Sequence, residues 1–115
     1  MQTQVESPQS RCKFALEHTD ITPPPNIYHR MWGAAKQDRA TGIHRPLRAT
    51  VLLLSPNKGF ERLFIIALDH CFMWKLEMDN LIDAVIDETG LLKEEFIVCF
   101  SHTHAAGLMG LERVS

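Results

Sequence analysis

Three apolar runs in the second half of the chain predict the strands of a sheet. They cover residues 47–55 (LRATVLLLS), 62–69 (RLFIIALD) and 96–100 (FIVCF). A cluster of Pro, Asn and Gly separates the first two runs, which favours an antiparallel hairpin. Both runs of this hairpin are almost wholly apolar, so we expect both faces of the sheet to be covered.

Between the second and third runs, residues 73–90 (MWKLEMDNLIDAVIDETG) change to the periodicity of an amphipathic helix. The apolar stripe that we expect to face the sheet consists of Trp74, Met78, Leu81, Ile82, Val85 and Ile86. The acidic residues expected on the opposite side are Glu77, Asp79, Asp83 and Asp87. Gly90 stands where a C′ residue would end the helix. We interpret Trp74 and the nearby methionines, Met73, Met78 and later Met109, as core residues and not as a cofactor site.

The first half of the chain gives weaker signals. Residues 1–10 are polar and aperiodic, which predicts a flexible arm. Residues 12–19 alternate roughly and predict a short strand. Residues 21–26 (ITPPPN) contain three consecutive prolines, which exclude helix and central strand and predict an extended connector. Residues 28–42 lack a clear period and predict an ordered loop with at most one helical turn.

Together these elements predict an α/β fold with a mixed sheet. A β-hairpin precedes a strand–helix–strand unit, whose crossover should be right-handed and whose two strands should be parallel. The chain of 115 residues has room for one domain.

Composition and charge narrow the possible partners. The net charge is -2 and no run of Lys or Arg occurs, so nothing predicts a nucleic-acid partner or an acidic membrane surface. The apolar runs are too short to span a bilayer, and the N-terminus lacks the apolar region of a signal peptide. A cytoplasmic location is therefore the default expectation.

The three cysteines, Cys12, Cys71 and Cys99, do not form a CxxC pair and their number is odd. A disulfide framework is not expected. Cys99 lies inside an apolar run, so we predict that it is a small buried hydrophobic residue and not a ligand.

Candidate chemistry gathers where two strands end. Asp69 and His70 follow one strand, and Ser101, His102, Thr103 and His104 follow its parallel neighbour. Ligands commonly bind at the carboxyl ends of parallel strands, and His and carboxylate are good ligands for a divalent metal such as zinc. In an extended segment His102 and His104 point to the same face. Either both bind one metal, or one binds it while the other holds a substrate or a water.

Simpler interpretations stand beside this one. An Asp after a strand, such as Asp69, more often caps a turn, and His70 is interpreted as a loop residue. The remaining histidines are isolated and are interpreted as hydrogen-bonded or exposed; they are His18, His29 and His44. A catalytic zinc normally has three protein ligands, whereas the sequence offers one firm pair.

Four segments match one family in the same order. They are TDITPPP (19–25), GIHRPLRATVLLL (42–54), LFIIALDH (63–70) and FSHTHAAG (100–107). This set resembles the N-terminal part of the neutral/alkaline, non-lysosomal ceramidase family, over residues 14–108.

The resemblance implies a zinc amidohydrolase that splits the amide of ceramide. By this resemblance His102 is a zinc ligand and His104 is a catalytic residue near the metal-bound water, while Asp69 and His44 are candidates to support them from outside the ligand shell. Residues 11–115 would then form the N-terminal part of a ceramidase-like α/β domain, and the predicted sheet would be an incomplete part of this larger domain. The family's other ligands, a second His, a Glu and a Tyr, lie further along its chain and have no counterpart here. The resemblance therefore implies an N-terminal fragment that is inactive alone and that needs a missing partner chain or self-association.

The chain departs from the family where Ala105, Ala106 and Gly107 replace a Ser-Gly-Pro sequence. Metallo-β-lactamase-like hydrolases are an alternative, because they also carry an HxH sequence after a strand. Their following Asp-His pair falls where this chain has Ala105 and Ala106. A second alternative is a non-catalytic remnant or interaction module that associates through an exposed sheet edge.

Overall fold

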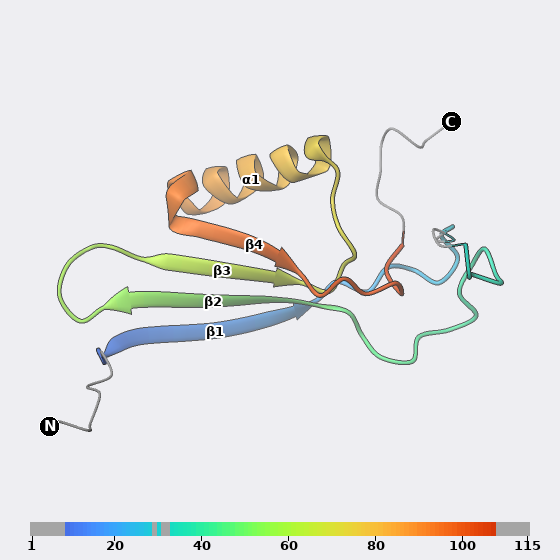
Figure 1. Cartoon of the computed structure of the whole chain (residues 1–115), viewed down its shortest axis with the longest axis horizontal. Helices are drawn as coiled ribbons and strands as arrows, with labels where there is room; N and C mark the ends of the chain where they lie inside the picture. Colours follow the sequence, from blue (N-terminus) through green and yellow to red (C-terminus); the bar gives the residue numbers. More distant parts are fainter. Residues whose placement is uncertain (1–8, 29, 31–32, 108–115) are drawn as a thin grey trace, which may run out of the picture.

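A computed structural model of the chain describes residues 9–28, 30 and 33–107. The predicted arm is outside this set except for its last two residues, and so are His29 and Met109. Within the described residues, one four-stranded sheet carries one α-helix along one face (Figure 1).

The sheet contains β1 (Cys12–Asp20), β2 (Arg48–Pro56), β3 (Leu63–Leu68) and β4 (Phe96–Phe100), in the order β1-β2-β3-β4. The pairs β1–β2 and β2–β3 are antiparallel, whereas β3 and β4 are parallel. This confirms the mixed sheet, the hairpin and the parallel strand pair. The right-handed crossover between β3 and β4 stays a prediction.

Helix α1 (Lys75–Thr89) connects β3 to β4 and is followed by a short 3-10 helix, η1 (Lys93–Glu95). Gly90 ends α1 as predicted, with φ 69° and its N–H donating to the Ile86 carbonyl at 2.8 Å. Two details of the predicted amphipathic pattern are wrong. Trp74 is the exposed N-cap residue, and Glu77 is buried. Glu77 lies one helical turn before Leu81 and so borders the apolar stripe.

The core lies between α1 and one face of the sheet. Its most buried side chains are Ile66, Leu68, Leu91 and Phe96. The partly buried residues packed against them are Ala49, Val51, Phe64, Met73, Leu81, Ile82, Val85, Ile86, Val98 and Phe100. The strand residues of this set alternate along β2, β3 and β4, and we call their side of the sheet the covered face. The expectation that Met73 packs in the core is confirmed.

The opposite side of the sheet, which we call the open face, has no described helix against it. Alternation and strand register place on it Cys12, Phe14, Leu16, His18, Asp20, Arg48, Thr50, Leu52, Leu54, Pro56, Leu63, Ile65, Ala67, Ile97 and Cys99. None of these residues is buried. The prediction that both faces are covered is therefore wrong, because the one helix covers one face. The prediction that Cys99 is buried is wrong for the same reason.

The segment before β2 folds back toward the end of β1. The Thr22 hydroxyl accepts a hydrogen bond from the Leu47 N–H at 2.8 Å, and the Ile21 N–H donates to the Leu47 carbonyl at 2.8 Å. The predicted loop at residues 28–42 contains turns and a bridge between Tyr28 and Arg39, and its described part holds no helix. No helix among the described residues is long and apolar enough to cross a membrane.

Candidate metal centre

The candidate site lies where the parallel strands β3 and β4 end. Beyond the strands, the Ser101 N–H donates to the Leu68 carbonyl at 3.0 Å, and the His102 N–H donates to the His70 carbonyl at 3.0 Å. These bonds hold the segment after β4 beside the segment after β3. The sequence-based prediction that the two strand ends meet is therefore confirmed.

Three potential metal ligands come together here. The ligand atoms of Cys71, His102 and His104 all lie within 4.8 Å of one another, so this cluster can hold a metal ion. The Cys71 sulfur lies 3.4 Å from His102 Nδ1, and the ring centroids of the two histidines are 5.3 Å apart. Cys71 is only 2% exposed, whereas both histidines are exposed. The arrangement is therefore open to solvent on the histidine side.

The backbone at His102 brings the histidines together in an unexpected way. His102 has φ 60°, and among the described residues it is the only non-glycine residue with a positive φ. A left-handed conformation costs a residue with a Cβ about 1–2 kcal/mol. The expectation of an extended segment is therefore wrong at His102, because the chain turns there. The two rings still meet, edge to face, at an interplanar angle of 69°.

The His102 ring has a partner that can orient it. Its Nδ1 lies 3.2 Å from the Cys71 carbonyl oxygen. When Nδ1 carries the proton it donates to this oxygen, which leaves Nε2 as the nitrogen with a lone pair. A hydrogen bond of this kind commonly sets the tautomer of a metal-binding histidine.

The donor set of one thiolate and two imidazoles fits a zinc site. Zinc accepts Cys sulfur and His nitrogen, and catalytic zinc sites commonly have three protein ligands with a fourth position open. Cys71 supplies the third ligand that the sequence analysis did not find. The sequence feature that could have indicated Cys71 is its position two residues after Asp69, in the segment that follows β3.

His70 is close in sequence but belongs to the interior. It lies in a bend after β3, as predicted for a loop residue, yet it is buried, with its ring centroid 6.4 Å from that of Phe100. Its Nε2 has no hydrogen-bond partner among the described residues. Burial lowers the pKa of His70, because removal from water disfavours the charged ring.

Asp69 has a structural role in the geometry. Its carboxylate accepts the Arg48 N–H at 3.0 Å, and its own N–H donates to the Arg48 carbonyl at 2.8 Å. Asp69 thereby ties the end of β3 to the beginning of β2, and it is not one of the three clustered ligands. His18 lies on the open face of β1, far along the chain from the cluster.

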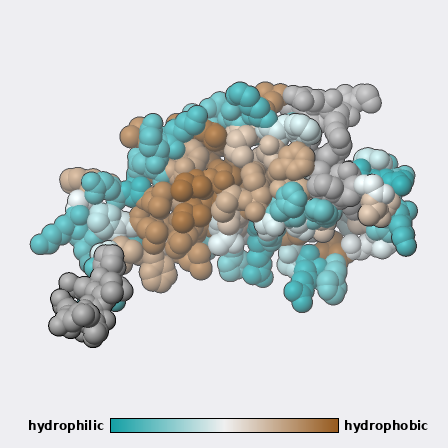
Figure 2. Space-filling view, viewed as in Figure 1, coloured by the Kyte–Doolittle hydropathy of each residue, from teal (hydrophilic) through white to brown (hydrophobic). Residues whose placement is uncertain are grey.

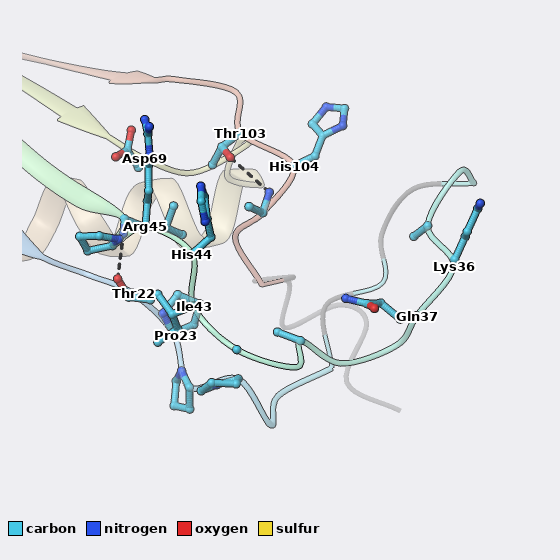
Figure 3. Close-up of a pocket in the computed structure, with 18 residues that line it drawn as sticks. Thr22, Pro23, Lys36, Gln37, Ile43, His44, Arg45, Asp69, Thr103 and His104 are labelled. Atoms are coloured by element: carbon cyan, nitrogen blue, oxygen red, sulfur yellow. Dashed lines mark hydrogen bonds between the residues drawn. The ribbon is translucent and has the colours of Figure 1, made fainter.

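A hollow of about 720 Å³ adjoins the cluster. Three of the residues selected from the sequence, His44, Asp69 and His104, line it. Figure 3 shows His44, Arg45 and Asp69 on one side of this hollow and Lys36 and Gln37 on the other. The remaining selected residue, His102, does not line the hollow. It lies in the same metal-ligand cluster as His104, which does line the hollow.

The lining of the hollow is mainly apolar. The apolar lining residues are Pro23, Pro24, Pro25, Ala35, Ala40, Ile43, Pro46, Leu47 and Ala105. The volume lies in the range typical of small-molecule sites, roughly 300–1,000 Å³. The hollow can therefore receive a small molecule with an apolar part beside the metal-ligand cluster.

A scan against protein-family models and a search of curated proteins found no match to this chain. The resemblance to the ceramidase family therefore stays a prediction.

Proposed function

We propose that this chain carries the zinc-binding strand end of a ceramidase-like amide hydrolase. The observation that carries the proposal is the cluster of Cys71, His102 and His104 beside the 720 Å³ hollow. The ordered match of four segments to the ceramidase family supplies the reaction and the substrate class. An amide with an apolar chain, such as a ceramide-like lipid, is the substrate that we infer.

Each residue receives a role from its position. Cys71 and His102 would hold the zinc, with the His102 Nδ1–H directed at the Cys71 carbonyl. His104 belongs to both the cluster and the hollow, so it would complete the ligand set or hold a proton at the reacting group. Bound zinc in such a site polarises a carbonyl and lowers the pKa of a coordinated water.

The hollow would position the substrate. Its proline, alanine and isoleucine lining suits an apolar chain, while Lys36, His44 and Arg45 supply polar contacts at its sides. Asp69 would act only indirectly, by fixing the beginning of β2 against the end of β3.

The decisive test measures zinc bound to the purified chain. We expect about one zinc per chain, since three donors make one site. Cys71→Ser and His102→Ala should each reduce the bound zinc at least about tenfold, because each removes one of three ligands. Cys12→Ser and His18→Ala are the matched controls, because both residues lie on β1 and outside the cluster. Equal zinc in all five proteins would reject the metal centre.

Hydrolysis is a separate measurement. The resemblance alone implies an inactive fragment, but Cys71 completes a set of three ligands within this chain. The zinc-loaded chain should therefore release fatty acid from a short-chain ceramide or a fluorogenic fatty amide, and the His104→Ala variant should lose most of this activity. Zinc binding without hydrolysis of either amide would retain the metal centre and reject the hydrolase.

Two alternatives to the ceramidase-like function are an interaction module and a metallo-β-lactamase-like hydrolase. The interaction module is favoured by one specific observation, the apolar open face of the sheet. The metallo-β-lactamase-like interpretation is weaker. It needs an Asp-His pair where Ala105 and Ala106 stand, and an alanine side chain has no atom that can bind a metal.

A further inference from the structure

The open face exposes large apolar side chains on adjacent strands. Phe14 and Leu16 of β1 are 72% and 55% exposed, and Ile97 of β4 is 54% exposed. Between them lie Leu52, Leu54 and Ile65, none of which is buried. Figure 2 shows hydrophobic residues gathered in a continuous patch over the strands. Large contiguous apolar patches on a protein surface mark interaction sites.

The composition of the open face suits contact with an identical surface. Among the strand residues that alternation places on it, only Asp20 and Arg48 are charged, and these two are register partners at one end of the sheet. The other charged residues of β1, Lys13 and Glu17, lie on the other side of the sheet. The charge of the open face is therefore balanced and confined to one end, and the apolar side chains of two copies can meet away from it. The interfaces of homodimers are correspondingly more apolar than those of transient complexes.

The area of the open face reaches the lower limit for a specific dimer interface. Strands of 5–9 residues are about 17–30 Å long, and four strands about 4.8 Å apart span about 19 Å. The face therefore covers about 500 Å² in each copy, and a face-to-face contact buries at least about 1,000 Å² in total. Specific interfaces begin at about this size.

We propose that two copies of this chain pack face to face through their open faces. The product is a β-sandwich with two central sheets about 10 Å apart and one α1 on each outer side. Pairing along the β1 edge is a different arrangement, because it extends the sheet and leaves Phe14, Leu16 and Ile97 in water. The proposal does not depend on the metal centre, since the ligands lie in loops beyond the strand ends.

The first test uses the unaltered chain and measures two quantities. Sedimentation should show a monomer that becomes a dimer between about 1 and about 100 µM, since association follows mass action. Alkylation of Cys99 by iodoacetamide should slow at least about tenfold over the same range, because the dimer excludes solvent from it. A chain that stays monomeric, or a dimer in which Cys99 still reacts at the monomer's rate, would overturn the proposal. The first result would assign the open face to another partner, and the second would indicate edge pairing.

The second test places a charge on the open face. Leu16→Glu and Ile97→Glu should weaken dimerisation at least about tenfold, because each buries an unpaired carboxylate at the interface. Phe60→Glu is the matched control, since Phe60 is fully exposed in the turn between β2 and β3 and outside the open face. Dimerisation of both open-face variants as strong as that of the control would contradict the proposal. If a variant fails to fold by circular dichroism, Cys99 protection in the unaltered chain decides the question.

Discussion

The covered face and the open face of the sheet are made by the same strands, yet only one of them is a core. Ile66 on the covered face is 8% exposed, whereas Ile97 on the open face is 54% exposed, although the two isoleucines belong to paired strands. The difference comes from α1, which packs on one side only. The apolar character of a strand residue thus predicts that it should be buried, but a second layer must exist to bury it.

The same contrast explains why the sheet looks unfinished. A strand that is apolar on both sides is typical of a sheet covered on both faces. Here one layer is supplied by the chain and the other is absent among the described residues. The predictions below compare the two faces directly or weaken the layer that covers one of them.

The largest expected difference is between Ile66→Ala and Ile97→Ala. The first should lower the free energy of unfolding by about 2–5 kcal/mol, because it leaves a cavity under α1. The second should lower it by at most about 1 kcal/mol in dilute, monomeric protein, because its side chain is already in water. Urea unfolding measures both values.

These two substitutions remove the same atoms, so side-chain chemistry cannot account for a difference. Equal losses in the monomer would mean that the open face is covered by part of the chain itself. A loss for Ile97→Ala that grows with protein concentration would instead support the proposed dimer.

A smaller effect is expected when the end of α1 is altered. Gly90→Ala should cost about 1–2 kcal/mol, because Gly90 has φ 69° and a Cβ is strained in that conformation. Space is not the cause, since a Cβ there meets no atom within 4 Å. Gly42→Ala is the control, with equal space and no positive φ, and it should be nearly neutral. Thermal unfolding that shifts equally in both variants would exclude the cap as the source of the effect.

The smallest loss of stability is expected when the ion pair between Arg62 and Glu95 is removed. This pair links η1 to the segment just before β3. Arg62 Nε donates to Glu95 Oε2 at 2.7 Å, and the Leu92 N–H donates to Glu95 Oε1 at 3.2 Å. The Arg62 hydrogen bond first, and the Leu92 bond next, lower the pKa of Glu95. The stabilisation is therefore present above the ordinary carboxyl pKa and is lost as the pH falls through the lowered value.

We therefore expect Glu95→Gln to lower the urea midpoint slightly at pH 7, and the gap from the unaltered chain to close as the pH falls through the lowered pKa of Glu95. Asp87→Asn is the control, because Asp87 is exposed on α1. A gap that persists unchanged at low pH would show that the charge of Glu95 is not its cause.

The candidate site was predicted in part. The strand-end argument selected His102 and His104, since an apolar run leads directly into them, and the structure places both in the metal-ligand cluster. The same argument did not predict Cys71 as a ligand, because no recognisable motif surrounds this residue. Cys71 meets His102 only because the segments after β3 and β4 are joined by backbone bonds and His102 adopts a left-handed conformation.

What the sequence alone determined is local. Side-chain period and turn residues specified the hairpin, the helix with its stop at Gly90, and the parallel strand after it, because these depend on neighbours along the chain. What only the tertiary structure decided is which face of the sheet is covered and which thiol joins the histidines. Both depend on contacts between residues that are distant along the chain, such as Cys71 and His102, which are 31 positions apart. Alternation assigns a side chain to a face, but it does not state whether another layer lies against that face.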